Sequence, residues 1–252
     1  MDKSKTYPKF LSQLIADKFF IYGNHTKDSL TFHGISEKSL ITTGCGRYDV
    51  LFNESKNTEG KYILLMSSGM PSRAFSYFLS NEVILEWEKM FESVFLALKE
   101  LDEKIIIKRH PTQKEVIDFK GMAEKFLPNV KIYKNKNTYE LLSNAKLVIS
   151  PLSSVLAEAI ILDKPIVMPR HIKHDFGPPH EATNAVRTID NPNESLTAIK
   201  EALYDEKIKL KLKKGRDEFL KENFEYQGSS TKKTIRTIDE ILKNDNFWIF
   251  NE

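Results

Sequence analysis

The sequence contains very little cysteine and almost no excess of charge of either sign. Its 252 residues include one cysteine, Cys45, which excludes an intramolecular disulfide and a zinc site built from cysteines. Lysine and arginine total 38 against 35 for aspartate and glutamate, so the net charge is only +3. Proteins that bind nucleic acid usually carry a much larger basic excess, so nucleic acid is not an expected partner.

Long hydrophobic runs are also lacking. No run approaches the roughly eighteen apolar residues of a membrane span, and the polar stretch 1–8 has no signal-peptide core. The expected compartment is therefore the cytoplasm. Lysines at positions 207, 209, 211, 213 and 214 give one expected helix a basic surface, for which a solvated face is the favoured interpretation. Contact with the inner face of an anionic membrane is the minority interpretation.

A polar segment divides the chain. Residues 53–60 contain no apolar side chain and end in Gly60, which is typical of a linker. Before it, residues 18–22, 25–33 and 39–43 read as strand, helix and strand, a βαβ-like unit too small to be a domain. We therefore expect 1–52 to be a remnant of another domain, or the passage from one, and 61–252 to form the main domain.

After this linker, short apolar runs alternate with segments of helical period. Isoleucine, valine and leucine without polar alternation are typical of strands covered on both faces, and the runs are residues 61–66, 104–108, 130–133, 147–150 and 165–168. Between the first two runs, apolar residues recur every three or four positions from Trp87 to Leu101, which predicts an amphipathic helix. The alternation predicts an α/β fold: a Rossmann-like, doubly wound parallel sheet with helices on both faces and a C-terminal helical tail.

Ligands of such sheets bind beyond the carboxyl ends of the strands, so the residues that follow each strand are the candidates. Ser67 and Ser68 follow the first expected strand, and Arg109 and His110 follow the second. Pro111 at a first helical position would leave His110 facing the cleft, where its imidazole could donate to a phosphate oxygen. A structural role is the more common one for a single histidine.

The most informative segment is 147–161, a buried strand followed by a serine-rich turn and an apolar helix. Ser153 and Ser154 at the helix start would leave backbone N–H groups free for a phosphate or diphosphate. Glu158 interrupts the apolar helix and could accept hydrogen bonds from a ribose diol. The alternative, at even odds, is that a serine only caps the helix and that Glu158 faces solvent.

Other chemistry is less well supported. The loop after the fifth strand contains His171, His180 and Glu181. Their spacing matches no helical zinc motif, so we interpret the loop as facing the substrate and not as binding a metal. No metal and no cofactor are therefore expected. The segment 44–46 lacks the third glycine of a dinucleotide fingerprint, and no phosphate loop of the Walker type is present. An ordinary, partly buried thiol is the favoured interpretation of Cys45.

Taken in order, four motifs resemble the donor-binding half of GT-B-fold glycosyltransferases, over roughly residues 16–243. They are Lys108-Arg109-His110-Pro111, Leu147-Val148-Ile149-Ser150, Ser153-Ser154-Val155-Leu156-Ala157-Glu158-Ala159 and Asp163-Lys164-Pro165-Ile166-Val167. Within this superfamily the chain is most similar to surface-polysaccharide enzymes that share a His-Pro and a Ser-Ser…Glu-Ala motif. These include the Kdo-transferase, sialyltransferase and CDP-glycerol glycerophosphotransferase groups.

The resemblance implies a metal-independent glycosyltransferase or glycerophosphotransferase of cell-surface polysaccharide synthesis. Its partners would be a nucleotide-sugar or a CDP- or CMP-activated donor, and a glycan or lipid-linked acceptor. His110, Ser153 and Ser154 would hold the donor phosphates together with Ser67, Ser68 and Arg109, and Glu158 would contact the ribose. The resemblance supplies no catalytic base, because the base of a GT-B enzyme generally comes from its N-terminal domain, which is absent or reduced here. Either this chain is a fragment, or a partner chain supplies the missing half. The alternatives are a UDP-N-acetylglucosamine 2-epimerase-like enzyme and a non-catalytic binding domain of the same fold.

Overall fold

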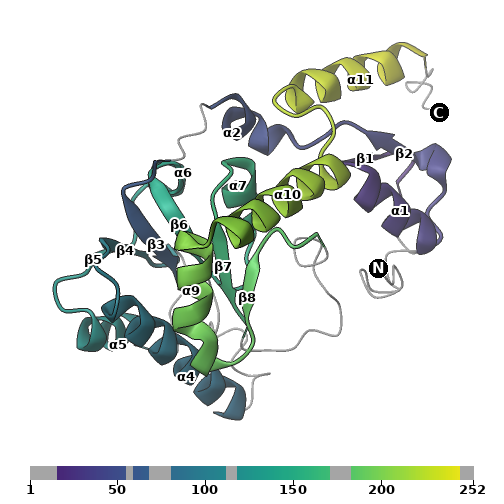
Figure 1. Ribbon diagram of the computed structural model, residues 1–252. Helices are drawn as coiled ribbons and strands as arrows, with labels where there is room; N and C mark the ends of the chain where they lie inside the picture. Colours follow the sequence, from purple (N-terminus) through teal and green to yellow (C-terminus); the bar gives the residue numbers. More distant parts are fainter. Residues whose placement is uncertain (1–15, 55–58, 68–80, 112–117, 171–182, 245–252) are drawn as a thin grey trace. The chain divides into compact units, whose positions relative to one another are not determined.

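The computed structural model describes residues 16–54, 59–67, 81–111, 118–170 and 183–244 (Figure 1). Contacts between residues divide the chain into two units. The first comprises Met1–Glu54, Asp175–Pro178 and Glu218–Glu252, and the second comprises Ser55–His174 and Pro179–Asp217. The larger, second unit contains the main sheet.

Six parallel strands of the described residues form this sheet, in the order β5-β4-β3-β6-β7-β8. Their bounds are β3 (Tyr62–Met66), β4 (Ile105–Lys108), β5 (Lys131–Tyr133), β6 (Ala145–Ile149), β7 (Ile166–Pro169) and β8 (Arg187–Ile189). The predicted doubly wound parallel sheet is therefore confirmed. All five expected strands are present, within one residue at each end except at the start of β6, which lies two residues earlier than expected. The sequence did not predict β8, which has three residues.

Helices cover both faces of the sheet, as expected. On one face, α4 (Asn81–Lys99), α5 (Phe119–Phe126) and α9 (Ser195–Tyr204) share a core with alternate strand residues such as Ile63, Leu65 and Ile107. Within α4 the expected apolar stripe is buried from Trp87 to Leu98. The intervening strand residues, such as Leu64 and Val148, are also fully buried, because α6 (Thr138–Ser143) and α7 (Val155–Ile161) contact the other face.

Asparagine side chains cap two of the described helical segments. The side chain of Asn137 accepts hydrogen bonds from the backbone N–H groups of Tyr139 and Glu140, at 2.8 and 3.3 Å, and begins α6. Asn191 accepts from the N–H of Asn193 at 3.0 Å and begins the short turn η5 (Pro192–Glu194), which leads into α9.

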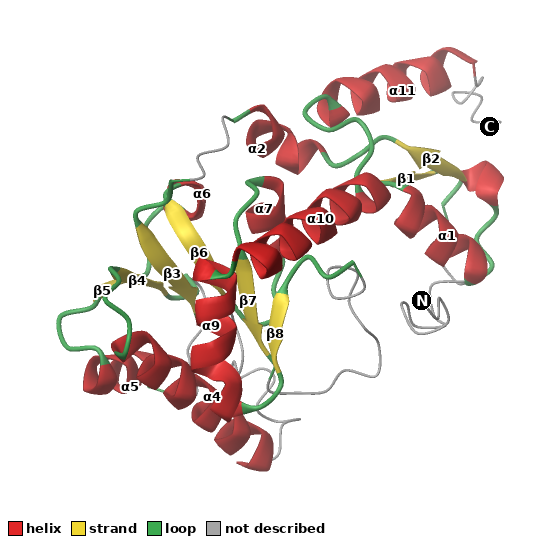
Figure 2. Cartoon of the chain, in the orientation of Figure 1, coloured by secondary structure: helices red, strands yellow, loops and turns green. Residues whose placement is uncertain are grey.

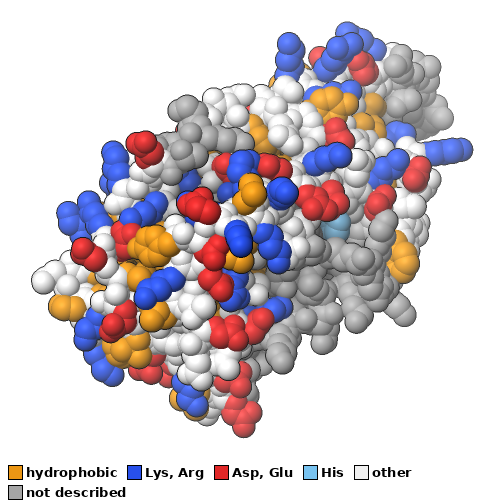
Figure 3. All heavy atoms as spheres, viewed as in Figure 1, with side chains coloured by type: hydrophobic (Ala, Val, Ile, Leu, Met, Phe, Trp, Pro, Cys, Tyr) orange, Lys and Arg blue, Asp and Glu red, His pale blue; other side chains and the backbone are white. Residues whose placement is uncertain are grey.

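The C-terminal tail contains two described helices, α10 (Glu206–Asn223) and α11 (Ser230–Asn244). The lysine-rich face of α10 is partly neutralised by carboxylates: Lys209 pairs with Glu206, and Lys213 pairs with Asp217 and Asp163. On the face visible in Figure 3, basic and acidic side chains are interspersed. None of the described helices is long and apolar enough to cross a membrane.

The middle of α10 is fixed to the turn between α7 and β7. Asp163 adopts a left-handed backbone conformation there, with φ of 54°, and its carboxylate pairs with the buried guanidinium of Arg216 at 2.9 Å. At the neighbouring Gly215, a Cβ atom would lie 2.3 Å from the carbonyl oxygen of Thr183. The helix therefore approaches the chain before β8 as closely as a glycine allows.

Substitution of Gly215 by alanine tests this close approach. In an exposed helix, alanine is about 1 kcal/mol more favourable than glycine. Here the Cβ would collide with backbone, so we expect Gly215→Ala to lower the free energy of unfolding by about 1–3 kcal/mol in urea denaturation. Lys214→Ala, at the exposed neighbouring position, is the control and should change it by less than about 0.5 kcal/mol. A Gly215→Ala variant as stable as the wild type would refute the contact.

The first unit begins with the expected βαβ-like arrangement. Strands β1 (Phe19–Ile21) and β2 (Leu40–Thr42) pair in parallel, and α1 (Asn24–Phe32) lies between them in the chain. A short helix follows, α2 (Asp49–Asn53), which the sequence analysis did not predict. The ring of Phe224 packs against Tyr22, Tyr48 and Phe52, with ring centroids 5.5–6.2 Å apart.

The glycines of the segment 44–46 serve packing in this unit. Gly44 has φ of +77°, and a Cβ on it would lie 2.2 Å from the Ser230 hydroxyl oxygen. A Cβ on Gly46 would lie 2.6 Å from the Thr231 hydroxyl oxygen. Cys45 between them is a buried free thiol. These glycines allow the first turn of α11 to lie directly against the chain, and that contact accounts for both of them.

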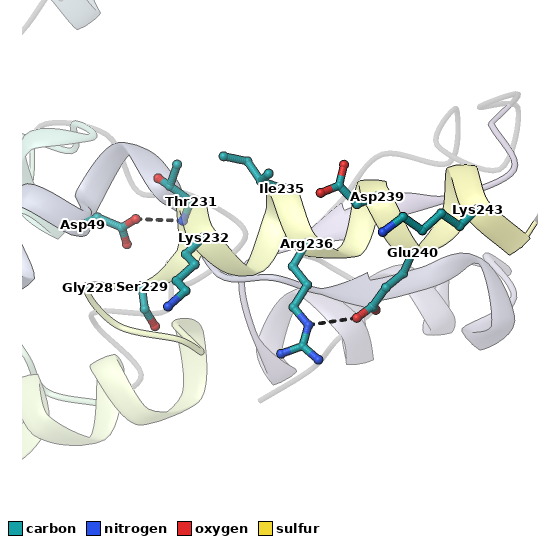
Figure 4. A pocket seen from close by; sticks show the side chains of 10 residues that line it. All are labelled: Asp49, Gly228, Ser229, Thr231, Lys232, Ile235, Arg236, Asp239, Glu240 and Lys243. Carbon is teal, nitrogen blue, oxygen red and sulfur yellow. Dashed lines mark hydrogen bonds and ion pairs between the residues drawn. The ribbon is translucent and has the colours of Figure 1, made fainter.

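Asp49 caps the same turn of α11 across a long sequence separation. Its carboxylate oxygens accept hydrogen bonds from the backbone N–H groups of Ser230 and Thr231 at 2.9 and 2.7 Å. Figure 4 shows the bond to Thr231. Burial alone would raise the pKa of this carboxyl group, but these hydrogen bonds outweigh it and hold the pKa below its ordinary value. A negative charge at a helix N-terminus is also favourable.

We expect Asp49→Ala to cost about 0.5–2 kcal/mol of stability, the usual worth of a helix cap. Because the folded pKa of Asp49 is lowered, its contribution is present above the unfolded pKa of about 3.9 and is lost as the pH falls through the folded value. The difference between wild type and variant, measured by thermal unfolding, should therefore shrink in acid. Asp49→Asn keeps one acceptor oxygen and should lose less stability. A difference that does not change between pH 7 and pH 2 would contradict the charge's role.

Candidate functional site

The winding of the sheet reverses direction between β3 and β6. From β3 the chain adds β4 and then β5 on one side, and it then returns to the other side of β3 to add β6, β7 and β8 (Figure 2). At such a switch point the loops after the two central strands run to opposite faces and leave room for a ligand at the carboxyl edge. The candidate residues after β3, β4 and β6 flank this point.

A hydrogen bond joins the loops that follow β3 and β4. The backbone N–H of His110 donates to the hydroxyl oxygen of Ser67 at 3.1 Å, and Ser67 is almost wholly buried. The N–H of Ser67 in turn donates to the carbonyl of Lys108. The structure thus brings together two of the predicted site residues, and this bond fixes the turn at which the half-buried His110 leaves the sheet.

A buried lysine joins the loops that follow β4 and β5. The ammonium of Lys108 donates to the carbonyl oxygens of Arg109 at 2.9 Å and Lys134 at 2.8 Å, while the side chain is 3% exposed. Burial lowers the pKa of this lysine from its ordinary value. The N–H of Arg109 donates to the carbonyl of Tyr133 and extends the strand pairing by one residue.

The serine-rich turn after β6 has both buried and accessible hydroxyl groups. Ser150 is fully buried, and its hydroxyl donates to the carbonyl of Pro151 at 3.0 Å. Ser153 is half-buried and accepts a long hydrogen bond, 3.4 Å, from the N–H of Val155. Ser154, at the start of α7, is exposed and its side chain makes no capping bond. Capping by Ser153 is therefore present but weak, and the hydroxyl of Ser154 does not serve as a cap.

Glu158 does not face solvent, so that part of the alternative interpretation is wrong. Its side chain is 4% exposed and lies in a run of buried residues that includes Ala159 and Ile160. The sequence could not decide this, because the phase of a nearly all-apolar helix is ambiguous. Burial of a carboxylate is costly unless its oxygens have partners.

The other candidates are distributed differently. Arg109 is half-buried at the carboxyl edge. Ser68, His171, His180 and Glu181 lie outside the described residues. After β7, Arg170 pairs with Asp190 at 2.5 Å, a partner that the sequence analysis missed because β8 was not predicted. Within the described ranges, no group of three or more histidine, cysteine, aspartate or glutamate residues could hold a metal ion.

A hollow of about 670 Å³ lies along α11 in the first unit and contains none of the candidate residues (Figure 4). Two of the acidic groups that line it are already engaged: Asp49 accepts from Ser230 and Thr231, and Glu240 pairs with Arg236 at 2.9 Å.

Comparison with known proteins identifies one matching family. The model of the family described as UDP-N-acetylglucosamine 2-epimerase matches residues 10–239. A search of curated proteins by sequence finds no match.

Several solved structures share the fold. One is S. aureus MnaA with UDP, at 16% identity and a TM-score of 0.66, covering 90% of this chain and 61% of that one. Another is the Methanocaldococcus jannaschii UDP-GlcNAc 2-epimerase with UDP-GlcNAc and UDP, at 18% identity and a TM-score of 0.57, covering 89% and 61%. The wall teichoic acid polymerase TagF is also similar, at 14% identity and a TM-score of 0.51, covering 93% and 60%.

These likenesses show a GT-B half-domain fold, and the chain spans about three fifths of the length of these relatives. The expected resemblance to GT-B nucleotide-sugar enzymes is thereby confirmed at the level of the superfamily. Within it, the matching family is the one that the sequence analysis placed second to the transferases. Because its model matches 230 of the 252 residues, the chain belongs to the UDP-N-acetylglucosamine 2-epimerase family.

Proposed function

We propose that this chain binds a UDP-sugar at the carboxyl edge of its main sheet and contributes that site to the 2-epimerisation of UDP-N-acetylglucosamine. The observation that carries the proposal is the switch point between β3 and β6, which the predicted residues Ser67, His110, Ser153 and Ser154 flank. Membership of the epimerase family selects the ligand class.

The diphosphate would lie between the turn after β4 and the start of α7. There the imidazole of His110 and the guanidinium of Arg109 can donate to phosphate oxygens. The exposed hydroxyl of Ser154, at the start of α7, adds a further donor. Ser67, which is buried, acts indirectly by accepting the N–H of His110. The negative charge on a departing diphosphate would be stabilised by the same groups.

Glu158 would accept hydrogen bonds from the ribose hydroxyl groups. It lies one turn into α7 and is buried, so a ligand that reaches it must enter beside the helix start. A carboxylate can accept two hydrogen bonds from a diol, which favours a nucleotide over a free phosphate.

A transferase of the TagF type is the second candidate. The fold similarity to TagF and to a glycosyltransferase from Rickettsia africae favours it. The same nucleotide site would then serve an activated donor, and a glycan or lipid-linked acceptor would be needed. An enzyme that forms UDP-N-acetylmannosamine from UDP-N-acetylglucosamine without any acceptor is an epimerase. ¹H NMR of the protein incubated with UDP-N-acetylglucosamine alone therefore distinguishes the epimerase from the transferase.

Calorimetric titration with UDP, CDP, CMP and GDP tests the ligand class. We expect UDP to bind most tightly, because the family is defined by UDP-sugars. Preference for CDP or CMP would favour the transferase instead. If none of the four binds a folded sample, the nucleotide site itself is refuted.

Two substitutions test the assigned residues. His110→Ala and Glu158→Gln should each weaken UDP binding by about 1–3 kcal/mol, the usual cost of a hydrogen bond that involves a charged group. Glu124→Gln, at an exposed position of α5, is the control and should leave the dissociation constant unchanged. Unchanged affinity in both site variants would show that UDP binds elsewhere.

A further inference from the structure

Lys108 is an unusual residue for the end of a central strand. It is 3% exposed, and within the described part of the chain only two backbone carbonyls, those of Arg109 and Lys134, accept from its ammonium. No carboxylate among the described residues pairs with it. A buried ammonium without a counter-charge is costly, whereas an apolar side chain would fill the same position without that cost.

The two carbonyls belong to different loops. One follows β4 and leads directly to His110, and the other follows β5, the next strand of the sheet. Because the ammonium reaches both, it holds the two loops at a fixed separation. Together with the bond from His110 to Ser67, it ties the chain after β3, β4 and β5 into one rigid edge.

A second buried lysine in the same sheet provides a natural comparison. Lys164 is 2% exposed and its ammonium donates to the carbonyl of Ser143 at 2.8 Å. It precedes β7, however, and so lies at the edge where the strands begin. Burial lowers the pKa of both lysines, but at Lys164 the negative charge of Asp163 opposes this effect, whereas burial is the one cause at Lys108 among the described residues.

We infer that Lys108 is a positioning residue of the nucleotide site: its ammonium fixes the loops after β4 and β5 around the ligand and places a buried positive charge beneath the diphosphate. The inference rests on the proposed function. An anion bound at this edge supplies the negative charge that the described surroundings of Lys108 lack. Without that anion, the dipoles of the two carbonyl groups are all that the described residues provide to offset the charge of the buried ammonium.

Paired substitutions separate this role from mere support of the fold. We expect Lys108→Met to weaken UDP binding by about tenfold or more in calorimetry, since both a charge and two hydrogen bonds are lost. Lys108→Arg keeps a charged donor and should restore affinity to within about threefold of the wild type. Lys164→Met should lose thermal stability but bind UDP as the wild type does.

Three results would overturn the inference. They are normal UDP affinity in Lys108→Met, an equal loss in Lys164→Met, and failure of a folded Lys108→Arg to restore binding. If the wild type binds none of the nucleotides, the proposed function fails, and the role of Lys108 fails with it. If the wild type binds UDP and Lys108→Met binds equally well, only the inference about Lys108 fails.

A spectroscopic measurement on the wild type covers the case in which a buried variant does not fold. The ammonium of Lys108 is shielded from water, so its ¹⁵N–¹H signal should be visible at low temperature. The signal of Lys164 is identified by its loss in Lys164→Met. The signal of Lys108 is identified by its shift in Ser67→Ala, which keeps both lysines and changes the contact beside Lys108. We expect the Lys108 signal to shift on addition of UDP and the Lys164 signal to stay. A Lys108 signal that does not respond to saturating UDP would contradict the inference.

Discussion

The position of β3 between β4 and β6 is the constraint on which the rest of the second unit depends. Because β3 is the first strand of this sheet in the chain and has neighbours on both sides, the chain must reverse its direction of winding once. Its central residues Ile63, Leu64 and Leu65 are fully buried, since helices cover both faces. The same reversal opens the carboxyl edge, so the feature that buries the centre of the sheet also creates room for a ligand.

Polar side chains satisfy backbone carbonyls at both edges of this sheet, but with different consequences. At the edge where the strands begin, the buried Tyr62 donates its hydroxyl to the carbonyl of Leu141 at 2.9 Å, and Lys164 donates to Ser143. Burial raises the pKa of Tyr62, so it remains a neutral donor. These bonds compensate carbonyls that lie beyond the strand ladder. At the other edge, Lys108 does the same for carbonyls in the loops after β4 and β5, and the hydroxyl of Ser67 accepts the backbone N–H of His110.

Much of the fold could be predicted because burial on both faces leaves a clear mark in the sequence. Runs such as Ile105 to Ile107 contain no polar alternation, and the stripe from Trp87 to Leu98 has a helical period. The strand β8 has only three residues, and two of them, Arg187 and Thr188, are polar, so no such mark exists. α2 has five residues, too few to show a helical period in the sequence.

The candidate site was predictable in its location and less so in its contacts. Serines and a histidine after consecutive strands indicate the carboxyl edge without any knowledge of strand order. The bonds that position them join residues far apart in the sequence: His110 to Ser67 across 43 positions, and Lys108 to Lys134 across 26. Local pattern carries no information on such pairs. The burial of Glu158 likewise depends on how α7 is rotated against the sheet, which an almost uniformly apolar helix does not encode.

The shared chemistry of the ligand explains why the motifs resemble transferases while the family is that of an epimerase. Both classes must hold a nucleotide joined through phosphate to a sugar or polyol, and in the proposed site the donors for that task would lie at the ends of β3, β4 and β6. The same phosphate-binding groups can serve either class, whatever happens to the sugar afterwards. The groups that distinguish epimerisation from transfer must instead contact the sugar carbon or the acceptor. A motif confined to the phosphate edge therefore identifies the superfamily, and the match over residues 10–239 is what separates the families within it.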